Sequence, residues 1–299
     1  MRILFTIAHY YSPAGRRAAD GRPHGSLSKK SQPRIDALAG CLNALHELFG
    51  KRQVMMEPTR LIARPANQLT SGTIDVIVCT TRDSHLLEHL SVPSRHFANH
   101  ATNAEPMLLG FECQAVLRDR LGGHDFYCFL EDDLILHDPW FFVKLEWFAS
   151  STSQQNLLQP NRFEVGPNPL AEKVYLDGDL PKVITRKFQD LRQAGVLESK
   201  VMGTVVRFRR ALNPHSGCYF LNAGQMEHWA KQPYFLDRDT RFVGPLESAA
   251  TLGIMRTFRV YKPAPENAGF LEVRHFGTAF LGKVRHAAAG SGPSLSERR

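Results

Sequence analysis

Three consecutive carboxylates, Glu131, Asp132 and Asp133, stand between two short apolar runs in the middle of the chain. The runs cover residues 127–130 and 134–136, a pattern typical of a buried strand that ends in an acidic turn. Like charges at such a strand end are costly unless a cation or hydrogen-bond donors compensate them. Mg2+ and Mn2+ commonly bind through one or two carboxylates together with substrate phosphates. The segment therefore predicts a metal–diphosphate site, and the alternative it leaves open is a solvated acidic turn.

The elements that must position these carboxylates follow the alternation of an α/β fold. Apolar runs predict core strands at 2–8, 75–81 and 127–136. Apolar residues at helical spacing predict helices at 35–49, 86–90, 106–121 and 140–148. This order favours a mixed, mainly parallel sheet flanked by helices, with ligands at the carboxyl ends of the strands.

The chain after residue 150 has a less regular pattern. Short strands are predicted at 157–159, 201–210, 217–222 and 258–262, the last of them as the final core strand. Helices are predicted at 185–194, 223–231 and 243–252. Polar, Gly-rich and Pro-rich segments predict loops at 12–33, 150–156 and 160–169, and a disordered tail at 287–299. The change of pattern places a boundary between two halves near residue 150.

Composition places the chain among ordinary globular proteins. Of its 299 residues, 43% are hydrophobic and 22% are charged, which is enough for a full core. The sequence has no run of about 18 apolar residues, so no membrane-spanning helix is predicted. The apolar run of residues 1–8 is too short for a signal peptide. The five cysteines are widely spaced and form no Cys-x-x-Cys pair, which argues against a disulfide framework and structural zinc. These features favour a cytoplasmic protein.

The net charge of +8 predicts an anionic partner. Part of the excess is local, because six cations fall within residues 16–34 and more lie in the tail. No nucleic-acid-binding signature accompanies the charge, so no nucleic-acid partner is expected. An anionic nucleotide donor or an anionic membrane surface explains the excess, and peripheral contact with a membrane is compatible with it.

The order of the central segment resembles a known family. An apolar strand, Glu-Asp-Asp, a short apolar strand and then Pro139 with aromatic residues is similar to the acid-x-acid segment of GT-A-type glycosyltransferases. The resemblance implies a GT-A-like fold in which a divalent Mn2+ or Mg2+ holds a nucleotide-sugar at the end of a core strand. It implies that Asp133 contacts the metal directly, that Glu131 helps to hold the same metal, and that Asp132 binds the nucleotide. Residues 1–150 would be the nucleotide-sugar-binding half and 151–286 the acceptor-binding half of one domain.

Two later segments fit the same resemblance. His215, Ser216 and Gly217 precede an apolar strand, as does a family segment that lines the donor and acceptor pocket, and the alternative is a plain turn. His275 matches the late histidine that completes the metal shell in many members, and imidazole suits Mn2+.

The resemblance also implies a catalytic base for an inverting reaction. Glu247 starts a predicted helix, where family members carry an acid that takes the proton of the acceptor hydroxyl. The family often has Glu-Asp at this point, whereas this chain has Glu247 followed by Ser248. Asp237 and Asp239 are rival bases, and a glutamate in the first turn of a helix is also stabilised by the helix dipole.

Polar side chains at the ends of the first two core strands are candidates for binding the nucleotide. Carboxylates and hydroxyls there can bind the base or ribose, and an arginine can pair with phosphate. With Asp132, the candidates are Thr6, Ala8, His9, Thr80 and Arg82.

The sequence therefore predicts a metal-dependent glycosyltransferase that transfers a sugar from a nucleotide-sugar to a glycan, lipid or small-molecule acceptor. Three alternatives remain. A nucleotidyltransferase could use the same acidic metal site, a GT-B enzyme would need no acidic motif, and a non-catalytic binding protein would use only the basic surface.

Overall fold

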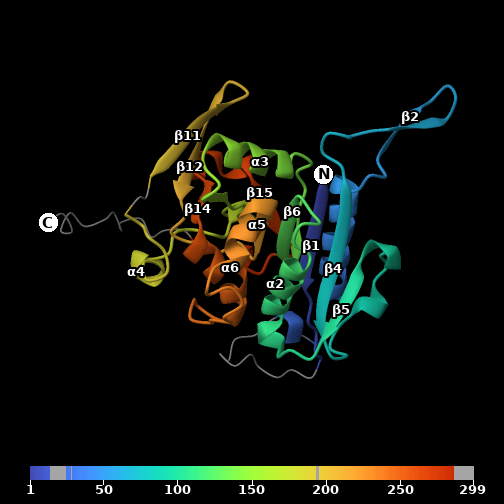
Figure 1. The fold of residues 1–299 in the computed structure, drawn as a ribbon. Coiled ribbons are helices and arrows are strands. Elements are labelled where there is room, and N and C mark those ends of the chain that lie inside the picture. The colour runs from blue at the N-terminus through green and yellow to red at the C-terminus, as the bar shows by residue number, and fades with distance from the viewer. Residues whose placement is uncertain (14–24, 28, 193–194, 286–299) are drawn as a thin grey trace.

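A five-stranded sheet forms the centre of the computed structural model, which describes residues 1–13, 25–27, 29–192 and 195–285 (Figure 1). Its strand order is β13-β6-β1-β4-β5. The strands are β1 (Arg2–Ala8), β4 (Thr73–Thr81), β5 (Ala98–Thr102), β6 (Phe126–Glu131) and β13 (Cys218–Asn222). All neighbouring pairs are parallel except β13 with β6. The prediction of a mixed, mainly parallel α/β sheet is confirmed.

Helices cover both faces of this sheet. They are α1 (Gln32–Phe49) and α3 (Phe141–Ser151) on one face, and α2 (Leu109–Asp119), α5 (Ala223–Ala230) and α6 (Pro245–Thr257) on the other. The short helix α4 (Lys182–Thr185) lies to one side of the sheet (Figure 1). Single turns of 3-10 helix lie at η1 (Gly25–Leu27), η2 (Leu87–His89), η3 (Ser94–His96), η4 (Pro106–Leu108) and η6 (Leu281–Lys283), and η5 spans Pro265–Phe270.

The alternation of side chains along β1 explains why both faces are covered. Ile3 and Phe5 pack in one buried cluster with residues of α1 and α3. Leu4 packs in a second cluster with residues of α2, α5 and α6. Successive side chains of a strand point to opposite faces, so a strand that is apolar throughout requires a layer of helices on each side.

Two smaller sheets stand beside the central one. One has the order β10-β9-β15-β7 and the other β11-β12-β14-β8. Their strands are β7 (Leu134–Ile135), β8 (Asn156–Leu158), β9 (Asn161–Val165), β10 (Lys173–Tyr175), β11 (Val196–Val201), β12 (Thr204–Arg210), β14 (Arg259–Pro263) and β15 (Glu272–His275). A separate hairpin pairs β2 (Val54–Glu57) with β3 (Ile62–Pro65). Because β7 directly follows the acidic turn, the first of these sheets brings β15 and β9 to the site.

Several predicted elements are wrong. The predicted loop at 160–169 contains β9, because Pro160 precedes a strand that alternates polar and apolar residues. Only α4 forms near the predicted helix 185–194, and residues 193–194 lie outside the described part. The predicted strand 201–210 forms from Thr204 onward as β12, but it begins three residues late, because Val201 ends the unpredicted strand β11 and the chain turns at Met202 and Gly203, both with positive φ. The strand 258–262 is not the last, because β15 follows it.

Two other predictions concern residues that the structure does not describe. The tail 287–299 lies outside the described residues, as do residues 14–24 and 28 of the predicted loop 12–33.

All five cysteines are buried and have free thiols. Within the described ranges, no helix is both long and apolar enough to cross a bilayer.

Candidate functional site

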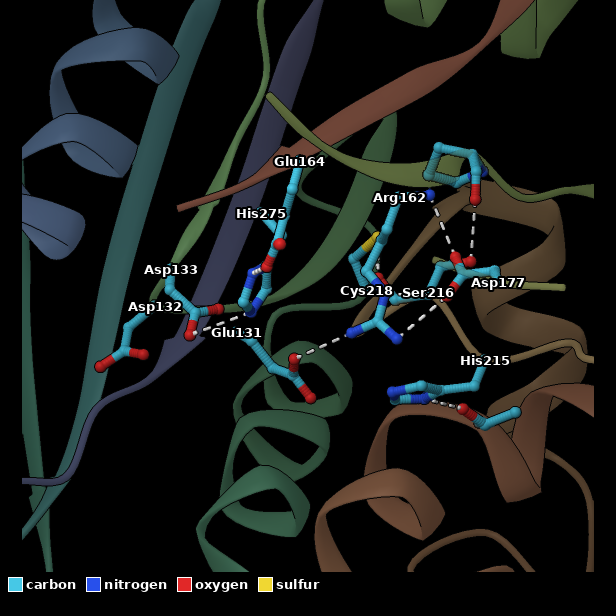
Figure 2. A network of polar contacts seen from close by, with 12 residues as sticks. Glu131, Asp132, Asp133, Arg162, Glu164, Asp177, His215, Ser216, Cys218 and His275 are labelled. Atoms are coloured by element: carbon cyan, nitrogen blue, oxygen red, sulfur yellow. Dashed lines mark hydrogen bonds and ion pairs between the residues drawn. The ribbon is translucent and has the colours of Figure 1, made fainter. Parts of the chain in front are cut away.

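The acidic turn lies at the carboxyl edge of the parallel strands. Glu131 ends β6 and stands beside Ala8, the last residue of β1. β4 runs parallel on the other side of β1, so three strands end at this edge. The sequence predicted this position correctly. The three carboxylates nevertheless face different partners, as Figure 2 shows.

Asp132 is almost completely buried and is bound by two donors. His9 Nε2 accepts a hydrogen bond from the backbone N–H of Leu86 (3.1 Å), so Nδ1 carries the proton and donates to Asp132 Oδ2 (2.6 Å). Arg34, from the first turn of α1, donates to Asp132 Oδ1. Burial alone would raise the pKa of Asp132, but Arg34 and His9 outweigh it and lower the pKa to about 2. Asp132 is therefore an anion held by protein groups.

Asp133 combines a bound oxygen with an unpartnered one. Its Oδ2 accepts a hydrogen bond from Arg34 Nη1 (3.0 Å) and lies 3.7 Å from His275 Nε2. Its Oδ1 is buried and has no hydrogen-bond partner among the described residues. A buried carboxylate oxygen in this state lacks the partner that such groups normally have, which a cation or a donor could supply.

His275 is fixed by a buried carboxylate on β9. Glu164 Oε2 accepts hydrogen bonds from the backbone N–H groups of Phe280 (2.9 Å) and Leu281 (2.6 Å). Its Oε1 lies 2.8 Å from His275 Nδ1, so the acceptor-only carboxylate places the imidazole proton on Nδ1. Nε2 of His275 then presents a lone pair toward Asp133. A carboxylate behind a histidine in this way is the usual support of a metal ligand.

Glu131 turns toward a different group of residues. Its Oε2 lies 3.8 Å from Arg162 Nη1. Burial raises the pKa of Glu131 to about 8; Arg162 opposes this shift, while the nearby charges of Asp133 and Glu247 add to it. Gly217 packs against this carboxyl with φ of 63°, and a Cβ there would collide with Glu131 Oε2. The Glu131 carboxyl is therefore protonated more readily than that of an ordinary glutamate.

A buried ion network continues from Arg162. Asp177 Oδ1 accepts hydrogen bonds from Nε and Nη2 of Arg162, each at 3.0 Å, and Asp177 Oδ2 accepts one from Lys262 Nζ, also at 3.0 Å. Lys262 Nζ also donates to the backbone carbonyl of His215 (2.6 Å). The network thus ties the Glu131 side of the pocket to the segment that carries His215 (Figure 2).

The predicted pocket segment lies in this network. His215 Nδ1 stands 2.9 Å from Thr251 Oγ1 on α6. Burial lowers the pKa of His215 well below its ordinary value, and the charges of Arg162 and Lys262 act in the same direction. Ser216 is buried and donates through Oγ to the carbonyl of Pro160 (2.9 Å). His215 is therefore neutral, and Ser216 holds the backbone rather than presenting its hydroxyl to solvent.

The candidate bases differ in their surroundings. Glu247 lies in the first turn of α6, is half-buried, and is close enough to raise the pKa of Glu131 by its charge. Asp239 is bound by Arg241 through two nitrogens, which lowers the pKa of the carboxyl. Asp237 Oδ2 accepts a hydrogen bond from Arg256 (2.9 Å). Of the three, Glu247 is the one whose charge acts on Glu131 of the acidic turn.

The strand-end nucleotide candidates are placed at the same edge but not with equal access. Thr6 is buried and donates to the carbonyl of Cys128 (3.1 Å), and Thr80 is buried and donates to Asn99 Oδ1 (2.9 Å). Ala8 is half-buried at the end of β1. Arg82 is exposed with φ of 51° and lies 3.9 Å from Glu105. His9 is buried with both ring nitrogens bound, so it positions Asp132.

Several residues of the site were missed from the sequence. Arg34 was noted only as part of a basic segment, and the others lie in a predicted loop, between predicted elements, or at the end of a predicted late strand. They are Arg162, Glu164, Asp177 and Lys262. The polar–apolar–polar alternation of Arg162, Phe163 and Glu164 was the signal of a strand in this segment. Residues two apart on a strand share a face, so the pattern would also have placed Arg162 and Glu164 together.

The side chains around Asp133 suit a divalent ion that receives only some of its ligands from the protein. In the described ranges no three His, Cys, Asp or Glu side chains converge as a complete metal site. Asp133 Oδ1 and His275 Nε2 supply two donors suited to Mn2+ or Mg2+. A cation of this kind takes its remaining ligands from water and from substrate phosphates.

Comparison with known proteins gives weak likenesses. No protein-family model and no curated protein sequence matches the chain. The crystal structure of S. aureus TarS aligns with 93% of this chain at 9% identity and a TM-score of 0.47, and this chain covers 37% of TarS. A mannose-1-phosphate geranyltransferase from Thermus thermophilus aligns with 88% of this chain and 73% of its own, at 11% identity and a TM-score of 0.35. These values carry no functional inference, so function is argued from the site.

Proposed function

We propose that this protein is a glycosyltransferase that transfers a sugar from a nucleotide-sugar donor. The observation that carries the proposal is the carboxylate triplet at the carboxyl end of β6, in which Asp133 keeps a buried, unpartnered Oδ1 while its Oδ2 lies 3.7 Å from Nε2 of His275. This edge of an open α/β sheet is where ligands bind. The fixed cation Arg34, which bridges Asp132 and Asp133, adds positive charge beside a diphosphate.

Mn2+ or Mg2+ would be held by Asp133 and His275. When bound, the ion would neutralise the diphosphate leaving group. Glu131 extends toward Arg162, so we assign its carboxyl to the pocket next to the metal. Arg34 and Asp132 hold the turn in place, and Glu164 holds the imidazole of His275 in the tautomer that leaves Nε2 free.

Glu247 is the proposed base for an inverting reaction. It stands in the first turn of α6, and its charge acts on Glu131, so the two carboxyls lie near each other. The Glu247 carboxylate would accept the proton of the acceptor hydroxyl as the oxygen attacks the anomeric carbon. The acceptor is a glycan, a lipid or a small molecule.

A thermal-shift screen of UDP-, GDP- and CMP-sugars, each with and without Mn2+, tests the proposal. A donor at about 100 times its dissociation constant should raise Tm by about 5 °C, and only with metal. Asp133→Asn should abolish the shift, whereas Asp119→Asn, an exposed carboxylate on α2, should preserve it. A screen in which no donor raises Tm, or in which Asp133→Asn responds like the parent, contradicts the proposal.

Product analysis separates the rival enzyme classes. The protein is incubated with Mn2+ and either nucleotide-sugars or nucleoside triphosphates with sugar phosphates. Release of UDP or GDP from the corresponding sugar, or of CMP from a CMP-sugar, supports the glycosyltransferase, while consumption of the triphosphate with release of pyrophosphate supports a nucleotidyltransferase. Sugar transfer that persists unchanged in Asp133→Ala would favour a GT-B-type reaction.

A further inference from the structure

Two β-hairpins project from the body of the molecule, each with a large apolar residue in its turn. Figure 1 shows the β2–β3 and β11–β12 hairpins reaching past the body at the same end, where β1 begins. Leu61 in the first turn is 77% exposed and Met202 in the second is 99% exposed. Their φ values are 55° and 47°. A left-handed backbone favours Gly, Asn or Asp, so the turn geometry does not explain a Leu or a Met at these positions. Packing does not explain them either, because both side chains are exposed.

The β2–β3 hairpin also has one exposed apolar face. Val54 lies opposite Pro65 and Met56 lies opposite Ala63, so these side chains share a face of the hairpin. Val54 and Met56 are both exposed. The other face carries Met55 and Ile62, which are also exposed, together with an ion pair of 2.9 Å between Glu57 and Arg64. Since β2 and β3 pair only with each other within the described chain, the hairpin gains little from the body, and its apolar face suits a further partner.

Cations surround both projections. Residues 51–72 contain four cations and one acid. In residues 196–210 the cations Lys200, Arg207 and Arg209 are exposed beside one acid, Glu198, whereas Arg210 is buried. At the base of the first hairpin, Arg52 and Arg95 lie near His96, whose ring stacks on that of His46 at 3.9 Å. Burial lowers the pKa of His96, and His46 and the two arginines act in the same direction. The two hairpins therefore combine exposed apolar side chains with cations nearby.

Of the available partners, an anionic lipid surface fits best. Contact with a second copy through these hairpins would bring their excess cations together. A nucleic acid would call for aromatic stacking, but residues 51–72 contain no aromatic residue and Phe208 of β12 is buried. The exposed apolar groups are aliphatic or thioether chains, which suit hydrocarbon.

We propose that the two hairpins dock this protein on an anionic bilayer. Leu61 and Met202 enter the boundary of the acyl chains, and the neighbouring Lys and Arg side chains lie among the lipid headgroups. Two separated contacts fix the orientation of the protein on the surface. β1 begins at the end that carries the hairpins, so the acidic turn beyond its carboxyl end lies away from the bilayer (Figure 1). Docking thus leaves the candidate active site open to solvent.

Flotation of the full chain with lipid vesicles tests the proposal without reference to activity. The vesicles are phosphatidylcholine alone or with about one third phosphatidylglycerol. The parent should bind the anionic vesicles at least about tenfold more tightly, and added salt should weaken binding. The double variant Leu61→Asn, Met202→Asn should lose at least about tenfold in affinity. Because Asn suits a left-handed turn, this variant should fold as well as the parent.

Val183→Ser provides the matched control, since Val183 is exposed on α4, away from both hairpins, and should leave vesicle binding unchanged. Equal binding to both kinds of vesicle, or full binding by the double variant, would overturn the proposal. A lipid-independent dimer in sedimentation analysis that the double variant disperses would assign the hairpins to a second copy instead. Unaltered binding by Lys51→Gln, Arg52→Gln would refute the role of the cations.

Discussion

Asp177 is the carboxylate that compensates the charges of two buried cations, Arg162 and Lys262. One carboxylate, 1% exposed, binds Arg162 and Lys262 together. Burial would raise the pKa of Asp177, but Arg162 and Lys262 lower it to about 2. Removing this anion leaves two cations enclosed without compensation, which is far more harmful than never having buried them.

We therefore expect Asp177→Asn to reduce the free energy of unfolding at pH 7 by about 3–5 kcal/mol. Asp179→Asn, which removes the exposed partner of Arg209, should change it by less than about 1 kcal/mol. Urea unfolding of the two variants and the parent gives the comparison. Equal stability of all three would show that the network contributes nothing.

The same carboxylate predicts a pH dependence. Its pKa is lower in the folded protein than the ordinary value of about 3.9, so its stabilisation is complete above about pH 4 and is lost as the pH falls toward 2. The difference in unfolding free energy between the parent and Asp177→Asn should therefore shrink over this interval. Unfolding series in urea at successive acidic pH values measure it, and a constant difference would contradict the assignment.

Gly217 gives a second test at the scale of one residue. Alanine at its positive φ should lose about 1–2 kcal/mol, and its Cβ would also displace Glu131. Gly122 has φ of 79° with open space around it, so Gly122→Ala carries the backbone strain alone. Gly217→Ala should thus be less stable than Gly122→Ala by about 1 kcal/mol or more. Equal losses in urea unfolding would mean that Glu131 moves freely.

The sequence located the acidic turn but not the partners of each acid. Glu131, Asp132 and Asp133 were recognised because three charges between apolar runs are unusual. Their division among Arg162, Arg34 and His275 depends on residues far along the chain, and spacing carries no information about such contacts.

At the scale of the element, β9 is the strand that completes the site. Arg162 and Glu164 share one face of it, and they reach Glu131 and His275 respectively. A loop was predicted here because prolines flank the segment. Proline at the position before a strand is compatible with pairing, so β9 forms beside β15.

Glu164→Gln tests whether β9 supports a metal ligand. The amide oxygen can still accept from His275 Nδ1, but the amide NH2 would face the N–H donors of Phe280 and Leu281. We expect Mn2+ affinity to fall about 10- to 100-fold, measured by calorimetric titration in the presence of the donor found in the thermal-shift screen. Glu172→Gln, at an exposed position before β10, is the control. Unchanged affinity in Glu164→Gln would remove His275 from the metal site.

The strongly periodic elements were predicted well and the short ones poorly. β1, β4, β6 and helices α1, α2 and α3 matched because each has a long apolar run or a clear helical stripe. β5 and β15 are short and partly polar, so their pairing depends on neighbours supplied by the fold. The turn of β11–β12 was missed because Met202 occupies a position where glycine or asparagine is the usual signal.

At the scale of the whole molecule, the two predicted halves share structure. The site takes Glu131 and Asp133 from the first half, and Arg162, Glu247 and His275 from the second. β13 lies beyond residue 150 but forms the edge of the central sheet next to β6, with Leu221 opposite Tyr127. The boundary near residue 150 is thus crossed by main-chain hydrogen bonds.

β13 pairs with β6, whose edge would otherwise have unpaired backbone groups. Dividing the chain after residue 150 should therefore give two fragments that depend on each other for folding. The piece 1–150 should aggregate on its own through the exposed backbone of β6. Co-expression with 151–299 should yield a soluble, reconstituted pair, detected as a one-to-one complex by gel filtration. A stable, monomeric 1–150 piece would show that the first half closes its own sheet, and the chain would then be two autonomous modules.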